Sequence, residues 1–192
     1  MPFPNKKYSI IYADPPWDYG ERTIVRQKGK HGKVFSARKY YGLMCKEDIQ
    51  KLKVPVTKDA WLILWATATK LPECLKLIEE WGFEYRTCAI WDKEHLGLGW
   101  FFRIQHEVLL IGKKGNPPTP KVKVRSIFKE KRTIHSKKPK CVISWIEKAF
   151  PNCDKLEMFA RTKRQGWDVW GNEVPTECQN ILSEVSSHSS HD

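Results

Sequence analysis

The sequence has no long run of apolar residues. Its longest strongly apolar run, residues 61–66, is far shorter than the stretch of about 20 residues that spans a bilayer. The start, Met-Pro-Phe-Pro-Asn-Lys-Lys, lacks the apolar centre of a signal peptide. We therefore expect a cytoplasmic protein of a prokaryote, or of the host cytoplasm if the protein is viral, with no membrane partner.

Cysteine is present but lacks the spacing of a metal site or a disulfide framework. The six cysteines lie far apart, with no Cys-x-x-Cys pair and no Cys/His cluster at zinc spacing. We therefore predict reduced thiols and no metal cofactor.

Apolar and aromatic residues are plentiful, which excludes global disorder. The chain has 192 residues, 41% of them hydrophobic, including nine Trp, eight Phe and six Tyr. This length fits one domain with a packed core. We place that domain at residues 1–175 and predict a disordered polar tail over residues 176–192.

Positive charge is concentrated in two segments. The net charge is +12, yet residues 20–40 hold seven basic residues and one acidic residue, and residues 113–140 hold eleven and one. Both segments are rich in Gly, Pro or short polar residues, so we interpret them as long surface loops on either side of a shared face. A polyanion is the natural ligand of such loops, although a purely solubilising surface has the same composition.

Strand-like and helix-like segments alternate, which predicts an α/β fold with a largely parallel sheet. Strands are expected at residues 8–13, 61–65, 85–91, 107–111 and 155–159. Helices are expected over residues 72–81, ending before Gly82, and from Pro139, in the first turn, to the residue before Pro151.

The sequence Asp14-Pro15-Pro16-Trp17 directly follows the first predicted strand, where open α/β sheets place their ligand sites. Two successive fixed φ angles make a stiff bend, and the residue before a proline is held extended. Because prolines donate no N–H, the Asp14 carboxylate and the Pro15 carbonyl could accept both hydrogens of one amino group without competing donors. Trp17 would offer a stacking surface for the base that carries this amine.

An adenine amine needs two acceptors because its lone pair is delocalised into the ring. Acceptors outside the ring plane would turn the lone pair out of conjugation and stabilise the positive charge that develops on nitrogen as a methyl group arrives. The alternative is structural: Asp14 would cap a helix, and Pro-Pro-Trp would be a packing turn.

Further sequence blocks follow the tetrapeptide in an ordered series, at residues 61–65, 81–83, 91–93, 106–107, 112–116, 135–139, 156–161 and 166–173. With them, residues 8–174 resemble the DPPW-motif adenine-N6 methyltransferases. That family includes the catalytic subunit of the eukaryotic mRNA adenosine methyltransferase and short phage and bacterial DNA enzymes. The resemblance implies a Rossmann-like fold with helices on both faces of the sheet and the catalytic motif placed before the main cofactor motif. It also implies S-adenosylmethionine as cofactor and S-adenosylhomocysteine as product.

The resemblance assigns roles by matching position. Asp14 would be the catalytic carboxylate, Pro15 the second acceptor, Pro16 part of the catalytic bend, and Trp17 part of the base pocket. The implied cofactor-binding residues are Asp14, Lys138, Glu157, Arg161, Asn172 and Glu173. Lys138 would contact the cofactor, and Glu157 and Arg161 would fix the loop around it. Asn172 and Glu173 would contact the ribose hydroxyls of the cofactor. Without the resemblance, Lys138 and Arg161 would be interpreted as a solvated helix start and a surface ion pair.

Two features depart from the family pattern. Only thirteen residues precede Asp14, so the acidic cofactor-contacting segment that longer relatives carry upstream is absent or replaced elsewhere. The spacing from Arg161 to Asn172 is also shorter than in the eukaryotic subunit, which leaves the roles of Lys163 and Arg164 open.

The predicted substrate is an unpaired or flipped-out adenine in DNA, because the chain is compact and resembles the short members of the family. The expected substrate-binding residues are Trp17, Tyr19, Lys28, Lys30, Lys33, Tyr40 and Tyr41. Residues 95–103, with glycines beside aromatic residues, would contact a neighbouring base or form a homodimer contact. The alternatives are an RNA adenosine methyltransferase and a catalytically silent nucleic-acid-binding subunit.

Overall fold

The computed structural model describes residues 2–18, 43–97, 99, 101–131 and 137–171, and the backbone of the short strands β2 (Ile24–Val25) and β3 (Phe35–Ser36). The predicted tail at residues 176–192 and most of the basic segment 20–40 lie outside these residues. Within them, no helix is long and apolar enough to cross a membrane.

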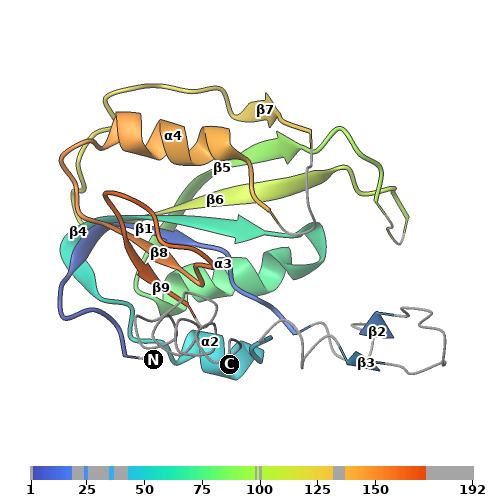
Figure 1. Ribbon diagram of the computed structural model, residues 1–192, viewed down its shortest axis with the longest axis horizontal. Coiled ribbons are helices and arrows are strands. Elements are labelled where there is room, and N and C mark those ends of the chain that lie inside the picture. The colour runs from blue at the N-terminus through green and yellow to red at the C-terminus, as the bar shows by residue number, and fades with distance from the viewer. Residues whose placement is uncertain are drawn as a thin grey trace, which may run out of the picture.

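A seven-stranded sheet forms the centre of the molecule, in the order β7-β5-β6-β4-β1-β8-β9 (Figure 1). Its strands are β1 (Tyr8–Ala13), β4 (Val56–Ala66), β5 (Glu84–Asp92), β6 (His106–Lys114), β7 (Ile127–Lys129), β8 (Lys155–Met158) and β9 (Asp168–Trp170). Every strand runs in the same direction except β6, which is antiparallel to both of its neighbours. The predicted α/β class with a mostly parallel sheet is confirmed.

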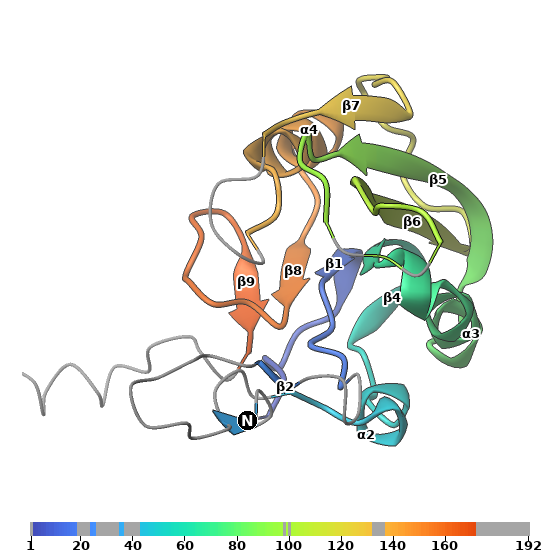
Figure 2. The same ribbon diagram turned by 90° about the vertical axis from the view of Figure 1, so that its right-hand side faces the viewer.

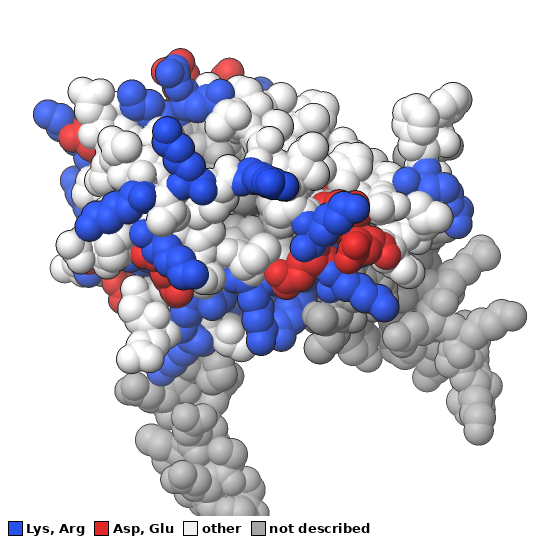
Figure 3. Space-filling view, turned by 90° about the horizontal axis from the view of Figure 1, so that it is seen from above, with Lys and Arg blue, Asp and Glu red and all other residues white. Residues whose placement is uncertain are grey.

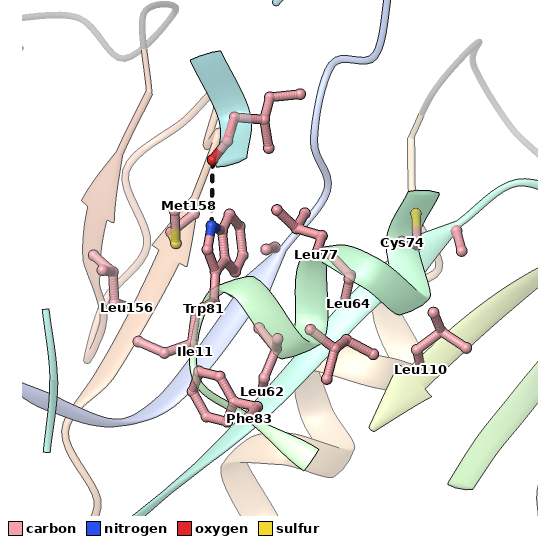
Figure 4. Close-up of a cluster of buried hydrophobic side chains, with 14 of the residues drawn as sticks. Ile11, Leu62, Leu64, Cys74, Leu77, Trp81, Phe83, Leu110, Leu156 and Met158 are labelled. Carbon is pink, nitrogen blue, oxygen red and sulfur yellow. Dashed lines mark hydrogen bonds between the residues drawn. The ribbon is translucent and has the colours of Figure 1, made fainter. Parts of the chain in front are cut away.

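Helices cover both faces of this sheet, as predicted (Figure 2). Helix α3 (Leu71–Glu80) buries Cys74, Leu77 and Ile78 on one face, at the spacing of a single helical stripe, together with the short helix α2 (Lys46–Gln50). Helix α4 (Lys140–Ala149) packs on the other face. Near the end of α3, the Trp81 indole donates a hydrogen bond to the Ile49 carbonyl at 3.2 Å, which joins α3 to α2 (Figure 4).

All five predicted strands are present, but the sequence missed β7 and β9, which are three residues each. No helix was predicted between β5 and β6, and these strands pair directly as an antiparallel hairpin in the otherwise parallel sheet. A three-residue strand carries too little periodicity to distinguish it from a loop.

The basic segment 113–140 is not one loop on one face. Lys113 and Lys114 lie at the end of antiparallel β6, beside the early residues of β4, whereas Lys129 pairs with Asp92 at the carboxyl end of β5. The positive charge of this segment is therefore divided between the two ends of the strands: the amino-terminal end of β4 and the carboxyl end of β5. Figure 3 shows Lys and Arg side chains spread over the α4 side rather than gathered in one patch.

Helix α4 is capped from a distant strand. Its N-cap residue is Pro139, one residue earlier than the first-turn position predicted for it, and Pro139 makes no side-chain cap. Instead, the carboxylate of Glu130, just after β7, accepts hydrogen bonds from the N–H groups of Lys140 at 3.0 Å and Cys141 at 3.3 Å. Glu130 thus joins β7 to the start of α4, and Lys138 lies immediately before that start.

Replacing this cap should lower stability in a pH-dependent way. We expect Glu130→Ala to reduce the free energy of unfolding by about 1 kcal/mol at pH 7, because two helix N–H groups lose their acceptor. Burial alone would raise the pKa of Glu130, but the N–H groups outweigh burial and lower it from 4.5. The stabilisation by the ionised cap is therefore present above pH 4.5. It is lost as the pH falls through the lower pKa that Glu130 has in the folded protein.

Urea unfolding at pH 7 and pH 3 measures this effect. The exposed Glu79→Ala on α3 is the matched control and should change little at either pH. A difference between wild type and Glu130→Ala that is as large at pH 3 as at pH 7 would contradict the charged cap.

Candidate functional site

Asp14 lies directly after β1, at the edge where the parallel strands β1, β4 and β8 end. Residues 14–18 are not helical, so the alternative that Asp14 caps a helix is excluded. The bend is held by two hydrogen bonds with Met44: its N–H donates to the Pro16 carbonyl at 2.9 Å, and its carbonyl accepts from Asp18 at 3.1 Å. A stiff bend at a sheet edge is therefore present, as predicted.

The prediction that no backbone donor competes for the Pro15 carbonyl is wrong. The N–H of Trp17 donates to this oxygen at 2.9 Å. A carbonyl oxygen has two lone pairs, so one acceptor position remains for a substrate hydrogen.

Trp17 is part of the hydrophobic core. Its side chain is 4% exposed and packs in the same cluster as the residues of α3. Its indole N–H is buried and makes no hydrogen bond within the described residues. The ring therefore anchors the bend at residues 14–17 to the core, and its stacking on a base stays a prediction.

Four charged side chains of alternating sign meet at this edge. Lys138 Nζ lies 2.7 Å from each carboxylate oxygen of Asp14 and 3.3 Å from Glu107 Oε2. Lys93 Nζ lies 3.4 Å from Glu107 Oε1. Asp14 follows β1, and Glu107 lies at the start of β6. Lys93 follows β5, and Lys138 precedes α4. Because β6 is antiparallel, its first residues lie at the edge where the other strands end.

Lys138 stays charged in this cluster. Burial alone would lower the pKa of Lys138, but the carboxylates of Asp14 and Glu107 outweigh burial and raise it above 10.5. Its ammonium also lies 5.4 Å from the centre of the Trp65 ring, a favourable cation–π position. The stability that this charge contributes is present below pH 10.5. It is lost as the pH rises through the higher pKa that Lys138 has in the folded protein.

Asp14 keeps an accessible side although Lys138 pairs with it. The Asp14 side chain is 35% exposed, whereas those of Lys138 and Glu107 are 15% and 16% exposed. A carboxylate in this position can accept hydrogen bonds from a substrate while a buried cation holds its orientation.

The other predicted cofactor-binding residues that the structure describes lie around the end of β8. Glu157 is in β8 and accepts a hydrogen bond from Arg164 Nε at 2.9 Å. Arg161, three residues after β8, is exposed. Arg164, whose role the sequence left open, is therefore the ion-pair partner of Glu157 in this structure.

The remaining predicted site residues lie outside the described residues: Tyr19, Lys28, Lys30, Lys33, Tyr40, Tyr41, Asn172 and Glu173. Their roles stay predictions. Two residues to which the sequence analysis gave no role in the site also belong to it: Glu107 contacts Lys138, and Lys93 contacts Glu107.

A separate cavity of about 680 Å³ lies on the α4 side of the sheet. Its apolar walls come from β4, β5, β6, α4 and the segment that leads into β7, and none of the predicted site residues lines it. In the described part of the chain, no three His, Cys, Asp or Glu side chains are grouped as metal ligands.

Comparison with known proteins shows that this chain is similar to methyltransferases. The MT-A70 family profile matches residues 8–173. The Type II methyltransferase M.MunI of a Mycoplasma species is 40% identical over 186 residues, which cover 90% of this chain and 80% of that protein.

Adenosine methyltransferases of eukaryotes are more distant. The human N(6)-adenosine-methyltransferase catalytic subunit METTL3 is 28% identical over 184 residues, 88% of this chain and 28% of that protein. The MT-A70-like N(6)-adenosine-methyltransferase of Arabidopsis thaliana is 27% identical over 179 residues, 87% of this chain and 24% of that protein. The chain therefore spans about a quarter of the length of these two relatives.

Proposed function

Because the chain belongs to the MT-A70 family, we propose that it is a methyltransferase that transfers a methyl group from S-adenosylmethionine to the N6 amine of adenine in DNA. The observation that carries the proposal is the partly exposed Asp14 carboxylate on a stiff bend at the carboxyl edge of the sheet, oriented by buried Lys138. Family membership confirms the resemblance predicted from the sequence blocks.

The donor set at this edge fits S-adenosylmethionine. The ammonium of Lys138 carries three N–H groups. When the two Asp14 oxygens share one of them and Glu107 accepts a second, the third is available to the methionyl carboxylate. We propose Asp14, Lys138, Glu157, Arg161, Asn172 and Glu173 as the residues that hold the cofactor. When bound, S-adenosylmethionine supplies an electrophilic methyl group.

The bend prepares the adenine amine to accept that methyl group. The Asp14 carboxylate and the remaining lone pair of the Pro15 carbonyl accept the two amine hydrogens, which turns the nitrogen lone pair out of the ring plane. As positive charge develops on nitrogen, the nearby carboxylate stabilises it without reorganisation, because Lys138 already holds the carboxylate in place. After methyl transfer the cationic nitrogen loses the proton that faces Asp14, and this partly exposed carboxylate passes it to water.

DNA is favoured over RNA by the comparisons. Identity is higher to the Type II methyltransferase, at 40%, than to the two adenosine methyltransferases, at 27% and 28%, whose names specify a ribonucleoside. The net charge of +12 suits either nucleic acid. We assign Trp17, Tyr19, Lys28, Lys30, Lys33, Tyr40 and Tyr41 to the binding of the nucleic acid.

Expression in a host without adenine methylation tests the proposal. Digested DNA and RNA from the same cells are analysed for methylated nucleosides by mass spectrometry, and the methylated positions in the DNA are then mapped. We expect N6-methyl-2′-deoxyadenosine in DNA at a recurring short sequence. Methylation of RNA alone would identify an RNA enzyme. No methylation of either, with no binding of S-adenosylmethionine at millimolar concentration, would identify a silent nucleic-acid-binding subunit.

A further inference from the structure

Two adjacent phenylalanines project from the loop between β5 and β6. The side chain of Phe101 is 89% exposed and that of Phe102 is 78% exposed, and their rings form an edge-to-face pair with centroids 4.8 Å apart. Leu96, in the same loop, is 60% exposed. Two adjacent phenylalanine rings that are this exposed are uncommon on a protein surface and indicate a binding partner.

The base of this loop is rigid. Lys93 donates its N–H to the Gln105 carbonyl at 2.9 Å, and Gly97 donates its N–H to the Ile104 carbonyl at 2.9 Å. The Asp92 carboxylate joins both arms, because it accepts from the Glu94 N–H at 2.9 Å and from Gln105 Nε2 at 2.7 Å. The loop therefore extends the β5–β6 hairpin in a defined direction.

Gly99 lies close to the backbone of Phe102. A Cβ at position 99 would overlap the Phe102 carbonyl oxygen, so only glycine fits there. The close approach of Gly99 to the backbone of the Phe pair therefore requires glycine at this position.

The hairpin rises from the edge of the sheet that carries Asp14. Lys93, in its first arm, contacts Glu107, which contacts Lys138, which contacts Asp14. Figure 1 shows the hairpin continuing beyond the ends of β5 and β6 on this side. A substrate bound at Asp14 therefore lies beside the base of the hairpin.

We propose that Phe101 and Phe102 insert into the base stack of duplex DNA, where they occupy the space that the target adenine leaves when it turns out toward Asp14. This inference rests on the proposed function. Extruding a base breaks its stacking on both neighbours, and an aromatic ring can restore part of that stacking. Exposed Arg103, next to the pair, is suited to an adjacent phosphate.

The size of the apolar group favours bases over a second copy of the chain. A stable protein interface buries about 1,200 Å² or more, whereas one aromatic side chain buries about 150–250 Å². Two rings on a narrow turn supply a small part of such an interface, but they match the area of one or two stacked bases.

Methyl transfer to native and heat-denatured DNA of the same preparation tests the insertion. The DNA comes from a host without adenine methylation, so no recognition sequence has to be known. We expect the double variant Phe101→Ala, Phe102→Ala to lose about 10-fold or more in kcat/KM on native DNA and less than about 3-fold on denatured DNA, which has no stack to restore. The pair Phe101→Tyr, Phe102→Tyr should keep activity on native DNA, because tyrosine stacks as phenylalanine does.

Two controls accompany this comparison. Val124→Ala with Ile127→Ala removes exposed apolar side chains of another surface and should leave the ratio of the two activities unchanged. The thermal midpoint of the Phe double variant should equal that of wild type, because both side chains are exposed.

Several results would overturn the insertion: equal loss on both DNA forms, no loss on native DNA, or wild-type activity confined to denatured DNA. A wild-type dimer that becomes a monomer in the double variant, measured by light scattering, would assign the pair to a contact between copies. Wild-type protein that methylates neither DNA form would instead refute the proposed function itself.

Discussion

The variant Asp14→Asn should lose methyl transfer about 1,000-fold while its affinity for DNA changes less than about 3-fold. Asparagine keeps the shape of the side chain but removes the negative charge that stabilises the developing charge on the amine. Its amide also points an N–H₂ donor where the substrate needs acceptors. DNA affinity depends mainly on contacts with phosphates, which a partly exposed carboxylate does not make. Filter binding and radiolabelled methyl transfer on the same DNA measure both quantities.

Asp154→Asn is the matched control for this variant. Asp154 is also an aspartate in an ion pair, at 2.6 Å from Lys6 Nζ, but it lies before β8, at the edge opposite Asp14. It should retain wild-type methyl transfer. Parallel losses of catalysis and DNA affinity in Asp14→Asn, with a lower thermal midpoint, would show that Asp14 supports the fold rather than the reaction.

The main elements of the fold could be predicted because their apolar patterns are long enough to interpret. Helix α3, for example, repeats its buried residues at helical spacing and stops where Gly82 adopts a positive φ of 76°. The direction of β6 could not be predicted, because a buried run of apolar residues looks the same in a parallel and an antiparallel strand.

The same limit explains which parts of the site the sequence missed. Asp14 could be found because it follows a strand and precedes two prolines, a local signal. Glu107 reaches Lys138, the partner of Asp14, only because β6 runs antiparallel and brings its first residues to the end of the sheet where β1, β4 and β8 finish. Lys93 joins through Glu107. Their sequence blocks contributed to the family resemblance, but nothing local assigned them to the charged cluster.

The other large expected effect is that of Lys138→Met, which removes the cation between two carboxylates. Methionine fills a similar volume, but Asp14 and Glu107 then face each other without the ammonium that both contact. Like charges in a partly buried site favour uptake of a proton by one of them, so part of the population loses the ionised carboxylate that the reaction needs. Asp14 also loses the cation that holds its orientation, so we expect methyl transfer at pH 7 to fall about 100-fold. The share of this loss that proton uptake causes should recover as the pH rises toward 9.

The pH profile separates this positioning role from direct binding of the cofactor by Lys138. Loss of a cofactor contact alone would raise KM for S-adenosylmethionine equally at every pH, whereas proton uptake by the carboxylates makes kcat rise with pH. Lys148→Met, which changes an exposed lysine on α4, is the matched control and should show the wild-type profile. A flat kcat profile in Lys138→Met would mean that the ammonium does not keep Asp14 ionised. Because Lys138 contacts both Asp14 and Glu107, the additional variant Glu107→Gln should restore part of kcat at pH 7 in Lys138→Met by removing the second carboxylate.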